Sequence, residues 1–159
     1  MNVKALKVND ELLIYQTLRL KDLIQEIVEC CEERKLYQNR KFGLPYAEIN
    51  CLMQFDGERY LTVKGISQKL DVAKSRVTKI VRGLIEKGMV EQISDPKDAR
   101  IKLISLTPAG QRKLEAIDAF LREIHRKILI QMEAEERENM LSYLQILRSA
   151  MEAVKEQLV

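Results

Sequence analysis

The chain has 159 residues, of which 46% are hydrophobic and 32% are charged, and its formal net charge at pH 7 is +3. This length suits one domain, and so high a charged fraction is typical of a soluble protein. The longest unbroken hydrophobic run, residues 12–15, has four residues. A spanning helix needs about 20, so we predict neither a membrane span nor a signal peptide.

The N-terminal part of the chain is predicted to be helical. Residues from about 10 to 36 contain no glycine or proline, and their apolar positions repeat at helical spacing. Residues 38–44 are polar and basic and are predicted to form a connector. Pro45 then begins a second helix, which Gly57 ends. The apolar side of this second helix consists of Ile49, Leu52, Met53 and Phe55.

Two helices separated by a short turn are predicted next, which is the helix-turn-helix arrangement. Thr62 can cap the first helix, and Asp71, Val72 and Ala73 form the turn. In the second helix one face is apolar at a period of 3.6 residues, and Gly88 follows its end. That face consists of Val77, Ile80, Val81, Leu84 and Ile85. The opposite face consists of Lys74, Ser75, Arg76, Thr78, Lys79 and Arg82.

A hairpin is predicted directly after this helix. Residues 89–94 and 100–106 are rich in β-branched and apolar side chains, and residues 95–99 carry the Asp and Pro that favour a turn. Its tip presents Lys97, Arg100 and Lys102, and Asp98 can pair with Arg100 and orient it. Thr107 and Pro108 are predicted to be the N-cap and the first residue of the following helix.

The C-terminal part of the chain is predicted to form two helices with coiled-coil-like seams. Apolar residues between positions 114 and 128 and between positions 140 and 158 step by three and four. We predict that residues 1–36 together with 109–159 form a helical dimerisation region, and that residues 44–108 form a separate DNA-binding region. The predicted fold is mainly α with a small β-hairpin wing, a winged helix-turn-helix core flanked by long dimerisation helices.

The charges are distributed unevenly along the chain. Residues 60–113 hold twelve Lys or Arg and five Asp or Glu, a net charge of +7, which leaves −4 for the rest. A basic segment of this kind is typical of nucleic-acid binding. An α-helix fits the major groove, where base edges can be distinguished, and cations on a hairpin suit the minor groove or the phosphates. The predicted DNA-binding residues are Lys74, Ser75, Arg76, Thr78, Lys79, Arg82, Lys97, Asp98, Arg100 and Lys102.

The order of these residues resembles the MarR family, winged helix-turn-helix transcriptional regulators of bacteria and archaea. The most specific part is Asp95-Pro96, Asp98 and Arg100, followed by Leu103 and Ser105-Leu106-Thr107, and the likeness covers about residues 44–115. Two positions depart from the family pattern. Asp71 and Ala73 stand where the family usually has Gly and Ser or Thr, so the helix cap is expected to be weaker.

The resemblance implies a cytoplasmic homodimer that binds a pseudo-palindromic operator and acts as a transcriptional repressor. Two recognition helices, one from each subunit, would enter successive major grooves, with Arg100 in the minor groove and Lys97 and Lys102 on phosphates. Members of the family often lose DNA affinity when a small, frequently aromatic anion binds between the dimer helices and the DNA-binding lobe. The resemblance therefore also implies a small aromatic or anionic effector.

Two alternatives stay open, a thiol-based redox-sensing regulator and a winged-helix protein-interaction scaffold without DNA binding. The odd count of three cysteines, Cys30, Cys31 and Cys51, indicates a reduced, cytoplasmic setting. Acidic neighbours of Cys31 disfavour a thiolate, so we expect the cysteines to be buried packing residues. No closely spaced ligand pair accompanies His125. No phosphate loop or catalytic motif is present either, so neither a metal, a cofactor nor an enzymatic activity is predicted.

Overall fold

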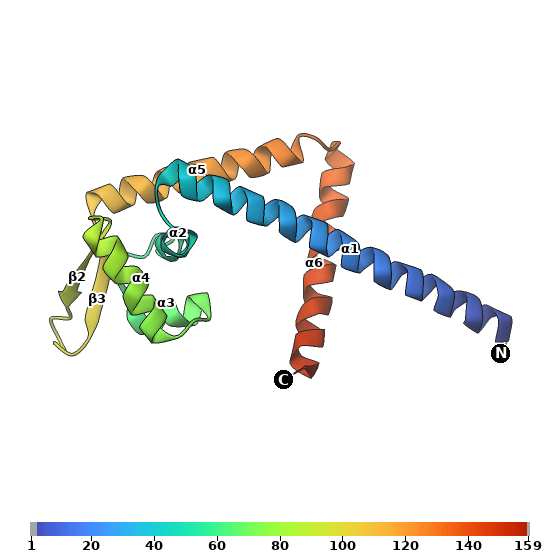
Figure 1. Ribbon diagram of the computed structural model, residues 1–159, viewed down its shortest axis with the longest axis horizontal. Helices are drawn as coiled ribbons and strands as arrows, with labels where there is room; N and C mark the ends of the chain where they lie inside the picture. The colour runs from blue at the N-terminus through green and yellow to red at the C-terminus, as the bar shows by residue number, and fades with distance from the viewer. Residues whose placement is uncertain (1–2, 159) are drawn as a thin grey trace. The chain divides into compact units, whose positions relative to one another are not determined.

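The computed structural model describes the backbone of residues 3–158 and the side chains of residues 9–158. In chain order the elements are α1 (Val3–Phe42), α2 (Tyr46–Met53), β1 (Leu61–Thr62), α3 (Val63–Leu70), α4 (Lys74–Glu86), β2 (Val90–Ser94), β3 (Lys102–Leu106), α5 (Pro108–Leu129) and α6 (Ala134–Gln157) (Figure 1). The predicted fold class, mainly α with a small β wing, is confirmed. The chain divides within α5, between Leu114 and Glu115, into two compact units. None of the helices in the described part combines the length and hydropathy needed to cross a membrane.

Helix α1 is longer than predicted at both ends. It begins at Val3 and runs without a break through the segment that we expected to be a connector, ending at Phe42. Gly43 follows with a φ of +64°, and its N–H donates to the Asn39 carbonyl at 2.9 Å. The polar composition of residues 38–41 was misleading because Gln38 is buried, with only 2% of its surface exposed. A helix can continue through polar residues when another element covers one of its faces.

The core of the first unit lies where α2, α3, α4 and the sheet meet. Ile49, Leu52 and Phe55, which the sequence assigned to the apolar side of one helix, are all buried. From α3 and α4 the core receives Ile66, Val77, Val81 and Leu84, and from the strands it receives Leu61, Val90 and Ile104. The predicted stripe of α4 is therefore confirmed at its centre, whereas Ile80 is half-buried and Ile85 is exposed.

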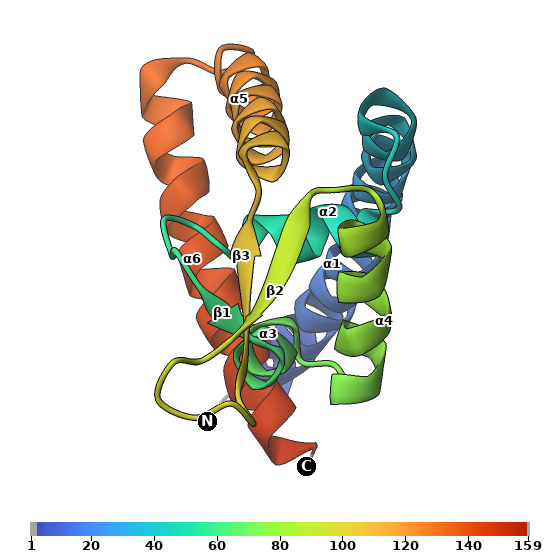
Figure 2. The same ribbon diagram turned by 90° about the vertical axis from the view of Figure 1, so that its left-hand side faces the viewer.

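The wing contains a third strand that the sequence did not predict. The sheet order is β1-β3-β2, and both pairings are antiparallel. Figure 2 shows the three strands β1, β3 and β2 beside one another. In the predicted hairpin Val90 pairs with Leu106 and Ser94 with Lys102, whereas β1 pairs Leu61 with Ile104. A strand of two residues carries no readable period, so only its pairing with β3 reveals it.

A close backbone contact joins the wing to α5. Thr107 caps α5 as predicted, since its Oγ1 accepts from the Gly110 N–H at 3.0 Å. The same hydroxyl donates to the Gly88 carbonyl at 2.5 Å, and the Thr107 N–H donates to the Met89 carbonyl at 3.1 Å. A Cβ at Gly110 would collide with the Met89 carbonyl. Glycine is therefore required at this position, because the start of α5 lies directly against the turn that follows α4.

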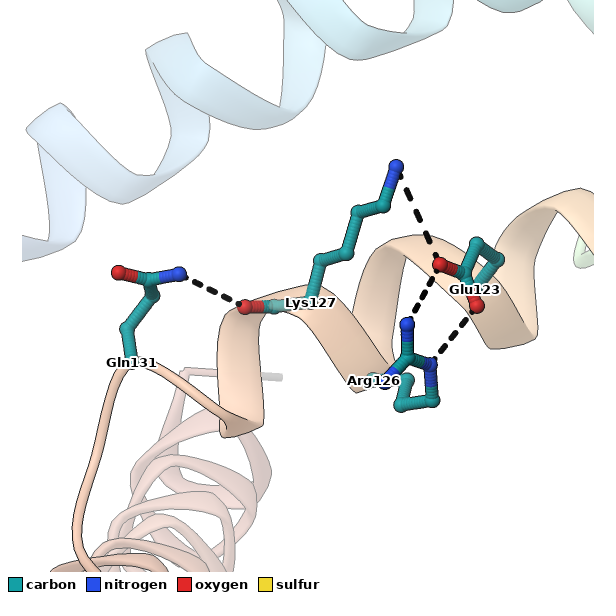
Figure 3. Close-up of polar contacts among 4 residues, drawn as sticks. All are labelled: Glu123, Arg126, Lys127 and Gln131. Atoms are coloured by element: carbon teal, nitrogen blue, oxygen red, sulfur yellow. Dashed lines mark hydrogen bonds and ion pairs between the residues drawn. The ribbon is translucent and has the colours of Figure 1, made fainter.

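The second unit consists of the remainder of α5 and α6. On the surface of α5 the Glu123 carboxylate accepts two hydrogen bonds from Arg126, both at 2.8 Å (Figure 3). Glu133 and Glu136 form a capping box at the start of α6. No residue of α6 is buried. Among its apolar residues Leu144, Met151 and Val154 are exposed by 47%, 52% and 53%, so the predicted seam has nothing covering it in the single chain.

Candidate nucleic-acid interface

The turn between α3 and α4 contains the two departures from the family pattern noted in the sequence, at Asp71 and at Ala73, and both are unfavourable for stability. Asp71 takes the left-handed conformation with a φ of +52°, where glycine would be unstrained. Ala73 is the N-cap of α4 and supplies no side-chain hydrogen bond. The turn is instead held by Ser67, whose Oγ donates to the Val72 carbonyl at 2.7 Å and whose carbonyl accepts from the Val72 N–H at 3.2 Å.

Supplying the missing cap should stabilise the protein. Ala73→Ser places a hydroxyl where it can accept from an N–H in the first turn of α4, and we expect the free energy of unfolding to rise by about 1 kcal/mol. Urea denaturation followed by circular dichroism measures this. Ala116→Ser, the same change at an exposed position within α5, should instead lower stability by a few tenths of a kcal/mol. Equal effects of the two variants would contradict the assignment of Ala73 as an uncapped N-cap.

The polar face of α4 is fully available to a partner. All six residues predicted for this face are exposed, namely Lys74, Ser75, Arg76, Thr78, Lys79 and Arg82. The Thr78 hydroxyl donates back to the Lys74 carbonyl at 3.0 Å, so its oxygen remains able to accept from a partner. Because Val77, Val81 and Leu84 are buried on the other side, this face cannot turn inward.

The tip of the wing is held by two aspartates that accept from backbone N–H groups. Asp95 accepts from the Lys97 N–H at 2.7 Å, and Asp98 accepts from the Arg100 N–H at 3.0 Å. Asp98 also accepts from Nε of Arg100 at 3.2 Å, so the predicted pairing of these two side chains is present. The Arg100 side chain is nevertheless 93% exposed. Lys102 reaches across the hairpin and donates to the Ser94 hydroxyl at 2.9 Å.

One ion pair between a buried carboxylate and an exposed lysine was not predicted. Glu48 of α2 accepts from Nζ of Lys87, at the end of α4, through both carboxylate oxygens. The sequence contains a weak signal for this pair: an acidic residue, Glu48, within the mainly apolar α2, and a glycine, Gly83, within α4. Neither signal identifies the other as its partner, because 39 residues separate Glu48 from Lys87.

The cysteines differ in their surroundings. The expectation of buried packing holds for Cys51 and is wrong for Cys30, which is exposed, while Cys31 is half-buried. Burial, together with the nearby Glu48 carboxylate, raises the pKa of the Cys51 thiol to about 12. Among the residues whose side chains are described, no group of three or more His, Cys, Asp or Glu could hold a metal ion.

Cys51 should resist alkylation in the folded protein. The thiolate is the reactive form, and with a pKa of about 12 the thiol stays protonated at pH 8. We expect iodoacetamide at pH 8 to label Cys51 only after unfolding in urea, whereas Cys30 is labelled in the native protein. Mass spectrometry after timed quenching measures both sites. Equal rates at Cys30 and Cys51 in the native protein would contradict this description of the core.

Comparison with known proteins agrees with this geometry. The model of the MarR family matches residues 42–101. The HTH-type transcriptional repressor MdtR of Bacillus subtilis is 28% identical over 82% of each chain. The transcriptional regulator YdgJ of the same organism is 27% identical over 67% of this chain and 65% of its own length, so the chain spans just under two thirds of that relative. Streptococcus pneumoniae FabT, solved in complex with DNA, superposes with a TM-score of 0.77 at 20% identity, covering 87% of this chain and 99% of FabT.

A two-helix motif with an exposed basic second helix, followed by a hairpin whose sheet is completed by β1, defines a winged helix-turn-helix protein. Within that class, the MarR family model over residues 42–101 and the named relatives support a MarR-family transcriptional regulator, and members of that family are not enzymes. The resemblance that the sequence indicated is thereby confirmed.

Proposed function

We propose that the protein is a homodimeric, sequence-specific DNA-binding repressor that acts in the cytoplasm by occupying a pseudo-palindromic operator. The observation that carries the proposal is the polar face of α4, six exposed side chains on a helix whose other face is buried. The N-terminal residues of a recognition helix reach base edges in the major groove. Lys74, Ser75 and Arg76 occupy those positions in α4.

The wing supplies the second contact. The Arg100 side chain is exposed and its Nε donates to Asp98, which can orient the guanidinium toward the minor groove. Lys97 and Lys102 would lie against phosphates on either side. FabT, which has the same fold, was solved in complex with DNA, and this supports DNA binding as the function of the fold.

A dimer is supported by the apolar surface that the single chain leaves uncovered. Helix α1 exposes Leu13, Leu20 and Ile27, and α6 exposes Leu144 and Met151, each by between 44% and 61%. Rows of exposed apolar side chains on long helices, here one on each of the two helices, are typical of an interface. Two copies of the chain would present two recognition helices, which matches the two half-sites of a palindromic operator. We place the dimerisation region in residues 1–36 and 109–159, beside the DNA-binding region of residues 44–108.

Selection of bound duplexes from random DNA tests the proposal and yields the operator. We expect an enriched inverted repeat, whose affinity in fluorescence anisotropy falls with salt by about 0.9 in log–log slope for each phosphate that the protein neutralises. Failure to enrich any duplex, with no binding at low salt, would favour the protein-interaction scaffold instead. Adding aromatic carboxylates to the same titration tests the effector, which should lower affinity for the selected duplex.

A further inference from the structure

Glu48 is a buried acidic residue within the proposed DNA-binding region, residues 44–108. It lies in α2 between Ala47 and Ile49 with only 7% of its surface exposed. Nζ of Lys87 donates to both of its carboxylate oxygens, at 2.8 and 2.7 Å. Burial of an ion is costly unless a partner of opposite charge is held in good geometry. The pair therefore links α2 to the end of α4 by a directional contact, which apolar packing does not provide.

Gly83 makes room for this pair. It lies inside α4, where glycine weakens a helix, and a Cβ at this position would collide with Oε1 of Glu48. The carboxylate thus lies directly against the backbone of the helix. Lys87 follows Gly83 by four residues, so both lie on the same face of α4. We name the ion pair of Glu48 and Lys87, together with Gly83, the Glu48–Lys87 clasp. Gly83 belongs to it because its missing side chain leaves space for the carboxylate.

The Glu48–Lys87 clasp lies at the junction between the end of α4 and the first strand of the wing, β2. The Lys87 N–H donates to the Gly83 carbonyl at 3.2 Å, and the next two N–H groups, of Gly88 and Met89, donate to carbonyls of Ile85 and Leu84 at 2.9 Å. Val90 then begins β2. Fixing Lys87 consequently fixes both the last turn of α4 and the first residue of the wing.

We propose that the Glu48–Lys87 clasp is a positioning device that sets the orientation of α4 and of the wing on α2, and so aligns their DNA-contacting side chains. The proposal rests on the proposed DNA-binding function. Neither Glu48 nor Gly83 is among the predicted DNA-binding residues. Each would therefore affect DNA binding indirectly, by holding Lys87 and the end of α4 in position. The apolar contacts of Val77, Val81 and Leu84 hold α4 in the core, while the clasp determines its angle.

Three variants test the clasp by different means. Glu48→Gln removes the buried charge, Lys87→Met removes its partner, and Gly83→Ala pushes the carboxylate away without changing any charge. Glu48→Gln is the sharpest of the three, because a protein that loses a negative charge should bind DNA more tightly on electrostatic grounds alone. If this variant instead binds DNA more weakly, the cause is a change in the orientation of α4 and the wing and not the change in charge.

Anisotropy on the selected duplex and on a scrambled duplex is the first measurement, made well below the melting temperature of each variant. We expect Glu48→Gln and Gly83→Ala to bind the selected duplex about tenfold more weakly, because displacement of about 1 Å costs well-aligned contacts heavily. Binding to the scrambled duplex should change little. Glu123→Gln, which breaks the exposed pair with Arg126 on α5 (Figure 3), is the matched control. It removes the same charge at an exposed site, so it should bind both duplexes at least as tightly as the wild type does.

Hydrogen exchange without DNA is the second measurement. The amides of Lys87, Gly88 and Met89 should exchange faster in the clasp variants, while those of α2 and β3 keep their protection. Wild-type affinity and discrimination in Glu48→Gln and Gly83→Ala would overturn the proposal, as would a uniform rise in exchange across the unit. If the wild type binds no duplex, the proposed function fails, and the exchange measurement still decides whether the clasp fixes the end of α4.

Discussion

Changing Leu144 and Leu147 to lysine should convert the proposed dimer into monomers and abolish binding to the proposed operator. Both side chains line an apolar groove of about 380 Å³ on α6, together with Met151. A buried leucine contributes about 1.5–3 kcal/mol. The dimer would lose four leucines, and their summed contribution is comparable with the ~8–12 kcal/mol of binding free energy in a micromolar to nanomolar complex. The new ammonium groups would also have to be buried in the interface. A monomer presents one recognition helix and cannot occupy the second half-site.

Light scattering and sedimentation velocity measure the assembly state, with anisotropy on the selected duplex as a second readout. Ser142→Lys with Ser149→Lys is the matched control. Both serines are exposed and lie on the opposite side of α6, so the same charges added there should leave the dimer intact. A wild-type dimer in the Leu144→Lys, Leu147→Lys variant would show that the interface lies elsewhere.

Removing Arg76 and removing Arg100 should have different consequences for DNA binding. Arg76 lies in the first turn of α4, where a bidentate contact to guanine is worth about 1–3 kcal/mol. Arg76→Ala should therefore weaken the selected duplex and relax preference at one operator position. Arg100→Ala should weaken selected and scrambled duplexes more evenly and make the salt dependence shallower, by roughly 0.9 in log–log slope for each phosphate that is no longer neutralised.

Fluorescence anisotropy at several salt concentrations, on the selected duplex and its single-base variants, separates the two effects. Arg126→Ala removes the same charge from an exposed position on α5 and should change neither affinity nor specificity. Wild-type binding by both Arg76→Ala and Arg100→Ala at every salt concentration would refute the assignment of α4 and the wing as the DNA-binding surface.

The candidate interface was predictable because its information is local. Along α4 a period of 3.6 separates Val77, Val81 and Leu84 from the cations, and the structure places the two groups on opposite faces. The Asp and Pro of the hairpin turn and the Thr107 cap act within a few residues of their own positions. Patterns of this kind determine which side chains face outward, and they do so before any other element is in place.

The sequence by itself therefore determined the helices, the hairpin, the polar face of α4 and the resemblance to the MarR family. Only the tertiary structure showed that α1 continues through residues 38–42, that β1 joins the sheet, and that Glu48 pairs with Lys87. Each of these depends on a partner distant in the chain. Polarity alone would place Gln38 and Glu48 at the surface, and only the fold shows that both are buried. For Glu48 the opposite charge of Lys87 offsets the cost of burying the carboxylate.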